Sequence, residues 1–516
     1  MIASLQSWVS DFRTALFPAG SLRGRFVKGT FWVLLGTAVS QGMQLGATVL
    51  VARWIGKSEY GELGIVTSTV GMFGVFVGLG LGLTATKYVS ELRQEEPVRA
   101  GRIAALTLGI ALVSGSMVTL ALILLSPWLA SHTLASPRVA TPLAIGSGLL
   151  FFGELNGVQS GILSGLEAFV AIAGASLWAG LCSFPIIVIA TYLWGLKGAV
   201  SGLVLSAAIN CILNNVALRR EAGNIGVPLS LPGSWKEKAV LWKFSVPAFL
   251  ASAVVTPTIW ICNTMLVNQP NGYAEMGLFS AANQWRNVVL FLPGIISRVL
   301  LPILSSHSKE SAEEASRFSN ALEVGFSAAV AIAFPLIALL SFASPLIAAA
   351  YGKDFGGMTG PLSGVLYTGG VMVLGAPGGL AIQAKAAMWL GLAVNLIWSG
   401  LMLGSFRFFL LSRGAWGLST ASAFSALSLT LLVLWYVSKA GYYPWRLASR
   451  TSLACIVLLV FAFGPLYLSP ALRVAVSPAV WAVSLVAAWI LLPERVSRVA
   501  GREAASLLHR GVVRNP

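Results

Sequence analysis

The sequence carries very little charge for its length. Only 10% of its 516 residues are charged, whereas 56% are hydrophobic and the mean hydropathy is +0.81. A folded chain cannot hide so many apolar side chains from water, so the solvent around them must be lipid. The shortage of charge therefore argues against a water-soluble protein and predicts an integral membrane protein.

Residues that carry chemistry are also scarce. The chain has two aspartates, Asp11 and Asp354, and three histidines, none grouped with a nucleophile or with metal ligands. Its four cysteines show no metal-binding or redox spacing. No Gly-rich loop followed by Lys and Ser or Thr is present for a nucleotide. We therefore expect neither an enzyme nor a bound metal, cofactor or ATP.

The net charge of +16 indicates membrane orientation better than it indicates nucleic-acid binding. The basic residues are divided among short loops between apolar runs. If the chain starts on the inner side, most of its 34 Lys and Arg residues fall on that side. The positive-inside rule then predicts that both termini are cytoplasmic.

Apolar runs of about twenty residues recur along the chain, and each predicts a transmembrane helix. In hydrocarbon, a helix alone lets such a run satisfy its own backbone hydrogen bonds. We predict fourteen spans. Their expected ranges are 30–52, 62–86, 102–130, 142–165, 169–193, 198–218, 242–268, 276–303, 318–343, 361–384, 389–411, 416–437, 449–468 and 474–493.

Two short sequence echoes predict an internal repeat. Residues 59–65 resemble 272–278, and residues 195–199 resemble 414–418. Both offsets correspond to six helices, and an even number gives the two units the same direction through the membrane. We therefore predict an all-α polytopic membrane protein with two parallel six-helix repeats and an accessory C-terminal helix pair.

The expected domain organisation follows from these spans. The N-terminal apolar residues have helical spacing, which fits an amphipathic surface helix or a frayed tail. The predicted parts are a cytoplasmic N-terminal segment at 1–29, an N-lobe at 30–218, a cytoplasmic linker at 219–241, a C-lobe at 242–437, the accessory pair at 449–493 and a basic cytoplasmic tail at 494–516.

Glycines recur at four-residue spacing in two of the expected spans of the N-lobe. This spacing predicts faces where helix backbones approach closely. The glycines are Gly74, Gly78 and Gly82 in one span, and Gly153, Gly157, Gly161 and Gly165 in the other.

Two charged residues deep within expected spans are the main candidates for a functional site. Arg286 and Glu154 would each cost roughly 2.5–3.5 kcal/mol at mid-helix unless they face a cavity or a partner. The planar guanidinium of Arg286 suits bidentate binding of a phosphate, and a structural ion pair is the alternative. Glu154 is a candidate for ion coupling, with structural pairing or hydrogen bonding as the alternative.

Further candidates are polar residues at repeat-related positions and cations near span ends. Polar stripes on spans 30–52 and 242–268 fit either a cavity or hydrogen bonds between helices. The cations near span ends act as interfacial anchors or as ligands. The candidate substrate-binding set is Arg286, Arg298, Asn283, Gln284, Asn263, Gln41, Gln44, Arg53 and Lys87.

Several short segments together have a pattern typical of one family. The segments are Ala-Arg-Trp-Ile-Gly at 52–56, Glu-Tyr-Gly at 59–61, Thr-Lys-Tyr-Val-Ser-Glu at 86–91, Phe-Ser-Val-Pro at 244–247, Met-Gly-Leu-Phe-Ser-Ala-Ala-Asn-Gln-Trp at 276–285 and Tyr-Gly-Lys-Asp-Phe at 351–355. They resemble the Wzx-type polysaccharide flippases of the MATE-like superfamily, which includes the lipid II flippases. The resemblance covers nearly the full chain.

The resemblance implies a fourteen-helix inner-membrane protein that moves undecaprenyl-pyrophosphate-linked oligosaccharides by alternating access. It implies a cavity lined by the first, second, seventh and eighth spans, with Arg286 as the first residue to carry over. The implied partners are the lipid-linked oligosaccharide, membrane lipids, a polysaccharide polymerase and chain-length machinery, with no nucleic acid. A MATE-like multidrug or metabolite antiporter is the nearest alternative, and a membrane-embedded glycosyltransferase or polymerase is the other.

Overall fold

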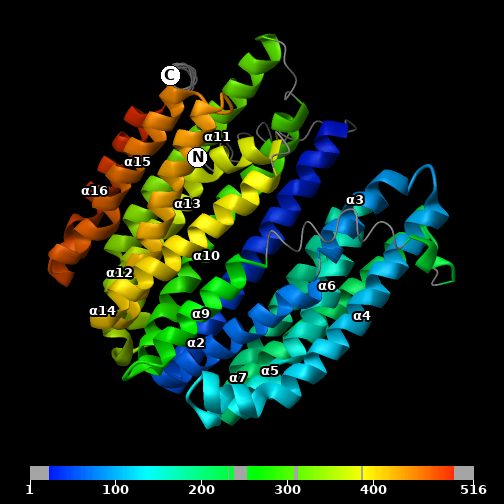
Figure 1. The fold of residues 1–516 in the computed structure, drawn as a ribbon, viewed down its shortest axis with the longest axis horizontal. Coiled ribbons are helices and arrows are strands. Elements are labelled where there is room, and N and C mark those ends of the chain that lie inside the picture. Colours follow the sequence, from blue (N-terminus) through cyan, green and yellow to red (C-terminus); the bar gives the residue numbers. More distant parts are fainter. Residues whose placement is uncertain are drawn as a thin grey trace, which may run out of the picture. The chain divides into compact units, whose positions relative to one another are not determined.

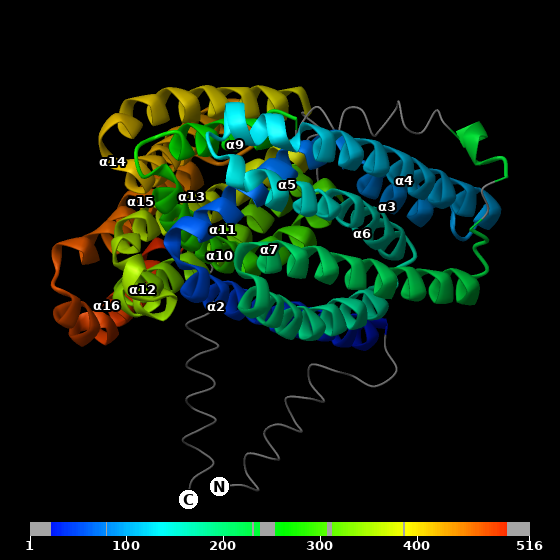
Figure 2. The ribbon, with the colours of Figure 1, turned by 90° about the horizontal axis from the view of Figure 1, so that it is seen from below.

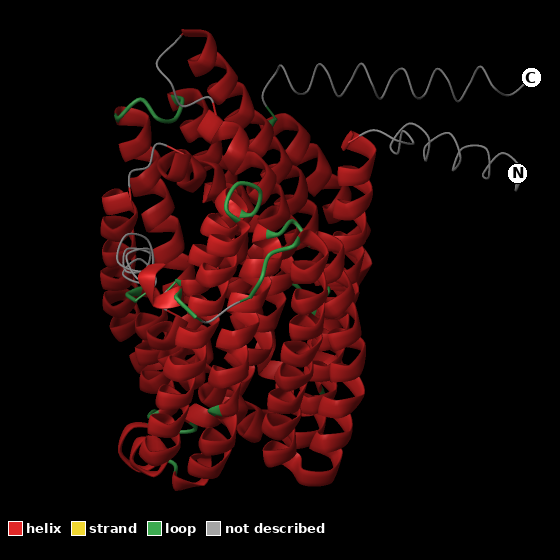
Figure 3. Cartoon of the chain, turned by 90° about the vertical axis from the view of Figure 1, so that its right-hand side faces the viewer, coloured by secondary structure: helices red, strands yellow, loops and turns green. Residues whose placement is uncertain are grey.

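The computed structural model describes residues 22–78, 80–229, 232–237, 253–306, 312–384 and 388–492. In these ranges all regular structure is helical (Figure 3). Most of the expected N-terminal segment and all of the expected basic tail lie outside the described residues. The predicted all-α fold is confirmed.

The chain divides into two compact units. Unit 1 comprises Met1–Ile55 and Glu62–Trp260, and unit 2 comprises Gly56–Gly61 and Ile261–Pro516. The division falls inside helix α9 (Val255–Val267), which lies in the expected span 242–268. The short segment Gly56–Gly61 therefore packs with the second half of the chain, although its sequence neighbours belong to the first.

Unit 1 is built from long helices joined by very short connections (Figure 1). Its elements are α2 (Leu22–Gly78), α3 (Leu81–Leu92), α4 (Pro97–Trp128), η1 (Leu129–Thr133), η2 (Pro137–Val139), α5 (Ala140–Gly146), α6 (Gly148–Gly165), α7 (Phe169–Ile225) and η3 (Ser234–Glu237).

Unit 2 continues in the same way. Its elements after α9 are α10 (Gly272–Ser306), α11 (Ala312–Phe342), α12 (Ser344–Tyr351), η5 (Lys353–Met358), α13 (Thr359–Ala384), α14 (Met388–Lys439), α15 (Trp445–Phe463), η6 (Gly464–Tyr467) and α16 (Pro470–Leu491).

Every expected span coincides with described helix over much of its length. Helices α2, α7 and α14 each contain two spans, because they bend at a non-helical residue. Among the described residues, 9 helices are long and apolar enough to cross a membrane, and α9 and α16 contain shorter apolar helices. The prediction of about fourteen membrane helices is therefore supported by helices throughout the chain.

The bends in α7 and α14 occur at positions that the sequence echo relates. Gly195 has φ 55° and ψ −134°, and Gly414 has φ 50° and ψ −126°. This region of backbone space is open to glycine and strained for other residues. Because both bends join corresponding spans with nearly the same geometry, they support the predicted six-helix repeat.

The other echo brings its two segments together inside unit 2. A Cβ added at Gly61 would meet the carbonyl of Tyr273, and one added at Gly277 would meet the carbonyl of Lys57. Two backbones approach this closely only where side chains are absent. Glu275, in the same segment, accepts a hydrogen bond from the backbone N–H of Ala415 at 2.8 Å.

In unit 1, α6 packs against α3, α4, α5 and α7 (Figure 2). The glycine faces meet as predicted, since a Cβ on Gly161 would collide with the backbone of Gly82. The Thr86 hydroxyl donates to the Gly161 carbonyl at 2.9 Å. Small side chains therefore set the spacing between α3 and α6.

In unit 2, α13 is the central helix and packs against α10, α11, α14 and α15. Ten consecutive residues of α13, 361–370, are buried, as expected for a helix surrounded on all sides. The Tyr367 hydroxyl donates to the Cys455 carbonyl of α15 at 3.2 Å. The rings of Phe334 and Phe461 add an edge contact at 5.8 Å, so α15 is joined to the bundle by large side chains.

Apolar side chains on the outside of the helices indicate a lipid-facing surface. On α4, Met117 and Leu124 are 67% and 72% exposed. Near the bends of α2 and α7, Trp54 packs edge-on against Tyr192, with ring centroids 5.6 Å apart. Aromatic pairs of this kind are typical of membrane–water interfaces.

Candidate functional site

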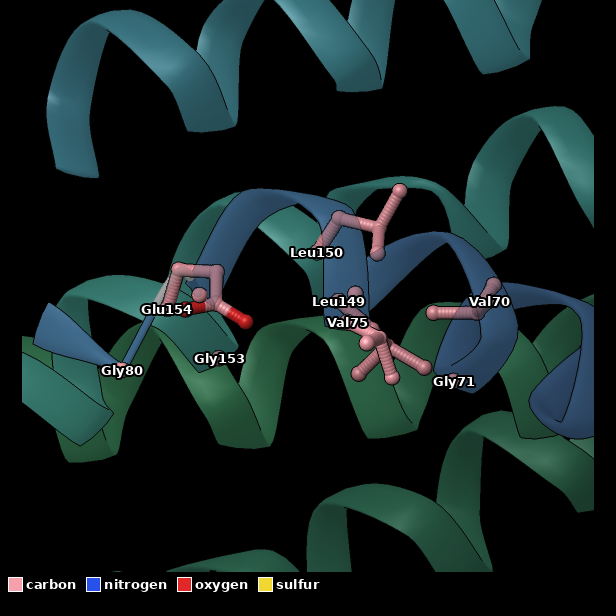
Figure 4. Close-up of a pocket in the computed structure, with 10 residues that line it drawn as sticks. Val70, Gly71, Val75, Gly80, Leu149, Leu150, Gly153 and Glu154 are labelled. Carbon is pink, nitrogen blue, oxygen red and sulfur yellow. The ribbon is translucent and has the colours of Figure 1, made fainter. Parts of the chain in front are cut away.

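Glu154 lines a cavity of about 400 Å³ in unit 1, where α2 ends and α3 begins. Helix α2 ends at Gly78 and α3 begins at Leu81, and Gly80 between them takes the left-handed conformation with φ 68°. Figure 4 shows the Glu154 carboxyl near Gly80 and Gly153. The cavity is lined by Val70, Gly71, Gly74, Val75, Gly78, Gly80, Leu149, Leu150, Gly153 and Glu154.

Glycines make room for this carboxyl. A Cβ added at Gly78 would lie 3.0 Å from Oε2 of Glu154, and one added at Gly74 would lie 3.8 Å from Oε1. The four-residue glycine spacing on α2, expected to serve packing alone, thus also accommodates an acid. On α6 itself, Gly153 and Gly157 have open space beside them.

The chemistry around Glu154 suits a proton or a cation. Within the described ranges, no Lys, Arg or His forms an ion pair with Glu154. A helix that stops leaves its last carbonyl groups without intrahelical donors, and α2 stops at Gly78 beside this carboxyl. A carboxyl beside the end of a broken helix offers oxygen acceptors to a proton or a cation, in the way that broken helices do in many transporters.

An amide network ties α6 to α7 near this cavity. Asn156 donates to the Ala207 carbonyl at 3.1 Å and accepts from Asn214 at 3.2 Å. Gln159 donates to the sulfur of Cys211 at 3.6 Å. The sequence-based search missed these residues, although amides in the middle of an apolar span were a usable signal. Their bonds hold the helix that carries Glu154.

Arg286 lies on α10 in unit 2 and packs against α13. A Cβ added at Gly369 would lie 3.3 Å from Cγ of Arg286. Arg286 Nε is buried and has no hydrogen-bond partner among the described residues, and the same is true of Asn283 Oδ1. Residues three apart lie on the same face of a helix, so an unused donor and an unused acceptor share one face of α10.

No carboxylate of the described residues lies within ion-pair distance of Arg286. The alternative of a structural ion pair therefore gains no support here. Buried polar atoms without partners are rare and call for an explanation, which a bound ligand would provide.

The remaining candidates in unit 2 lie on α9 and α10. Asn263 is buried, with 5% of its surface exposed. Gln284 lies on α10 and is partly exposed. Arg298 is also on α10, but its side chain is outside the described residues. Among the candidates, Asn283, Gln284 and Arg286 therefore share one stretch of helix.

The candidates in unit 1 are dispersed. Gln41, Gln44 and Arg53 are exposed on α2, and Lys87 is exposed on α3 with its ammonium 5.3 Å from the centre of the Tyr88 ring. Arg53 precedes the bend of α2, whereas Lys87 lies near the far end of the returning α3. One head group therefore does not touch both cations.

Two residues of the polar stripe expected on α9, Trp260 and Asn263, have different surroundings. The Trp260 indole N–H donates to the Thr69 hydroxyl on α2 at 3.0 Å, within unit 1. The stripe's next member, Asn263, is buried in unit 2. At Trp260 the alternative of a bond between helices therefore holds.

This arrangement of helices is that of multi-pass transporters. The lipid II flippase MurJ in its inward closed conformation matches with a TM-score of 0.64 at 15% identity, over 93% of this chain and 99% of that one. An inward-facing multidrug resistance MATE transporter of the MOP superfamily matches with a TM-score of 0.62 at 15% identity, over 78% and 95%. These similarities establish the MATE-like fold.

The chain belongs to the family of polysaccharide biosynthesis proteins, whose model matches residues 26–308. The EPS I polysaccharide export inner membrane protein EpsE of Ralstonia solanacearum is 23% identical over 58% of this chain and 68% of its own length. The lipid III flippase of Escherichia coli K12 is 24% identical over 54% and 67%. The family predicted from the sequence is confirmed.

Proposed function

We propose that this chain is a flippase that moves an undecaprenyl-pyrophosphate-linked oligosaccharide across the inner membrane for surface polysaccharide assembly. Membership of the polysaccharide biosynthesis family and similarity to an export protein and a lipid flippase support this role. The observation in the structure that carries it is the unused donor of Arg286 beside the unused acceptor of Asn283.

The substrate offers the groups that these two side chains lack. A pyrophosphate provides anionic oxygens, which accept charge-assisted hydrogen bonds from the guanidinium of Arg286. A sugar hydroxyl donates to Asn283 Oδ1. Arginine suits this task better than lysine because its planar fork binds two oxygens at once. We expect Gln284 and Asn263 to contribute further polar contacts during alternating access.

Export of the surface polysaccharide by cells that carry variants tests the proposal. Arg286→Ala removes the guanidinium and should abolish export while membrane levels stay normal. Arg286→Lys keeps the charge without the fork and should restore export poorly. Arg446→Ala, at an exposed arginine in the first turn of α15, is the matched control and should export normally. Normal export by Arg286→Ala would contradict the assignment of the head-group site.

We further propose that Glu154 couples transport to a proton or a cation, because its carboxyl lies in a cavity beside the end of α2. Transport by proteoliposomes, measured with a proton gradient, a sodium gradient or neither, identifies the ion. Glu154→Gln should remove the dependence on that gradient, whereas Glu95→Gln, at an exposed acid before α4, should retain it.

A multidrug or metabolite antiporter is the second candidate, and the solved MATE structures share its fold. An antiporter of cationic drugs needs acidic groups in its cavity, and Glu154 in unit 1 is one such group. On α10, by contrast, the described groups without a hydrogen-bond partner include the cation Arg286 and the amide of Asn283. Drug resistance that depends on this chain, with unchanged polysaccharide, would favour the antiporter.

We place both termini in the cytoplasm and expect the product to pass to a polysaccharide polymerase and chain-length machinery on the outer side. The bias of Lys and Arg supports this orientation. Reporter fusions at each terminus test it, because an outer-side reporter signal at either end contradicts the assignment.

A further inference from the structure

A second cavity, of about 410 Å³, lies at one end of unit 2. It is bordered by the end of α12, the turn η5, the first residue of α13 and the first turn of α16. Two cationic side chains, Lys353 and Arg473, line it together with Gly352, Gly356 and Thr359. None of these residues belongs to the substrate site proposed above.

Arg473 is held rigidly at the edge of this cavity. Only 7% of its surface is exposed. Its Nε donates to the Leu468 carbonyl at 2.9 Å, and its Nη2 donates to the Leu466 carbonyl at 3.1 Å. A guanidinium has five N–H donors, so these two bonds fix its plane and leave donors for a ligand.

The positive charge of Arg473 has no balancing acid in the described part of the chain. Asp354 is the acidic residue of the neighbouring η5, but it is exposed and forms no ion pair with Arg473 there. A charge that is largely withdrawn from water is costly unless it is paired. The site therefore calls for an anion.

The other walls suit an oxyanion. Gly356 is exposed and has open space beside it, so a ligand meets no side chain there. Thr359 begins α13, a helix of 26 residues, and offers a hydroxyl where the helix dipole is positive. Lys353 adds a second, exposed cation. These donors converge from three elements of one unit.

Exposed apolar side chains next in sequence to two lining residues favour a lipid over a soluble anion. Leu346 on α12 and Leu472 on α16 are 60% and 47% exposed. They neighbour the lining residues Pro345 and Arg473 in the sequence. An amphiphile can therefore place its charged head group in the cavity and its chains on this apolar surface.

We infer that the cavity between η5, α13 and α16 binds the phosphate head group of an anionic membrane lipid. Arg473 and Lys353 contact the phosphate oxygens, and Thr359 supplies a hydroxyl donor. The lipid would link the accessory helix α16 to the start of α13. This site is independent of whether the chain is a flippase, since it concerns resident lipid and not cargo.

Native mass spectrometry of the purified full-length protein tests the inference. Phosphatidylglycerol is the anionic probe and phosphatidylcholine the zwitterionic one. We expect the wild type to retain phosphatidylglycerol preferentially. Lys353→Gln and Arg473→Gln should each weaken it about tenfold, the effect of losing one charge-assisted hydrogen bond. Arg446→Gln, the matched exposed arginine, should bind like the wild type.

A cavity-filling variant keeps the test valid if Arg473→Gln misfolds. Gly356→Phe retains both cations but occupies the open space, and it should also weaken phosphatidylglycerol binding about tenfold. Equal retention of the two lipids by the wild type, or unchanged binding in Lys353→Gln and Gly356→Phe, would overturn the inference. Tight binding of inorganic phosphate without phosphatidylglycerol would overturn the lipid assignment in favour of a soluble anion.

Discussion

The two units handle a buried charge in opposite ways. In unit 1, Glu154 lies in an open cavity, where glycines of α2 leave room for its carboxyl. In unit 2, Arg286 packs its stem on Gly369, and its Nε is buried without a hydrogen-bond partner among the described residues. This difference fits the proposed roles, a mobile ion at Glu154 and a fixed contact at Arg286.

The helices of the two units also pack differently around Glu154 and Arg286. Unit 1 brings α3 and α6 together through glycine backbones, at Gly82 and Gly161. In unit 2, α13 and its neighbours carry large buried rings, including Tyr367 on α13 and Phe334 on α11. Backbone contact permits small adjustments at a helix break, while interlocked rings hold one arrangement. We take this to mean that ion coupling belongs to unit 1 and head-group positioning to unit 2.

The largest effect should come from breaking the glycine seam of unit 1. Gly161→Val would force Cβ and both methyl groups into the backbone of Gly82, so the helices must separate. Overpacking costs about 1–3 kcal/mol or more, and we expect most of the folded protein to be lost. Size-exclusion chromatography of a fluorescent fusion measures it. Gly157→Ala, with open space at Cβ, should elute normally. Equal elution of Gly161→Val and Gly157→Ala would contradict the tight contact between Gly161 and Gly82.

Transport by variants of Glu154 and Arg286, measured with an ion gradient and after the gradient has collapsed, tests the functional difference between the two units. Glu154→Asp should keep part of the gradient-driven transport, and Glu154→Gln should lose about tenfold, the equivalent of one charged hydrogen bond. Arg286→Ala should lose transport with or without the gradient. Uptake of a lipid-linked oligosaccharide analogue by proteoliposomes provides the measurement. Transport by Glu154→Gln that still depends on the gradient would contradict the assignment of ion coupling to unit 1.

The repeat-related bends allow a direct stability comparison. Gly195→Ala and Gly414→Ala both place a Cβ in a backbone region that strains it by about 1–3 kcal/mol. At Gly414 the added Cβ also meets Oε2 of Glu275 at 2.5 Å. We therefore expect the larger drop in melting temperature for Gly414→Ala. Glu275→Ala removes these side-chain atoms, so in that background the gap between the two glycine variants should close if the contact causes it and persist if it does not.

The smallest effect concerns the support of Arg286. Gly369→Ala adds a Cβ 3.3 Å from the arginine Cγ, which must shift by a few tenths of an ångström. Misplacement of about 1 Å can cost a hundredfold in a precise site, so we expect a reduction of about threefold in export with normal melting temperature. Gly379→Ala on the same helix has open space and serves as the control. A loss that follows melting temperature would indicate general destabilisation instead.

Much of the fold was predictable because hydrocarbon leaves few choices. Long apolar runs must be helices, so the described parts of the expected spans are largely helical, with residues 242–252 outside the described residues. The four-residue glycine spacing predicted close backbone approach, and the structure shows it between Gly82 and Gly161. The boundary between units was less accessible. It falls at Trp260, in the middle of an apolar span, because segment Gly56–Gly61 and the end of α9 pack with the second half of the chain.

The candidate site was predictable only in part. Arg286 and Glu154 stood out because a charge within a span is costly. The exposed positions of Gln41 and Arg53, and the separation of Arg53 from Lys87, depended on helix rotation and direction. Asn156 and Asn214 were missed because an uncharged amide in a span is a weaker signal than a charge. Nothing in the sequence singled out Arg473, and its carbonyl anchors became visible only when η6 and α16 were placed.

By itself, the sequence determined the solvent, the helical class, the family and the two charges that lipid cannot tolerate. These follow from composition, run length and the energetic cost of a single residue, none of which requires knowing its neighbours. Only the tertiary structure decided that Glu154 faces a broken helix, that no carboxylate of the described residues pairs with Arg286 and that Arg473 and Lys353 line one cavity. Those statements are about distances between residues far apart in the chain, and packing alone sets them.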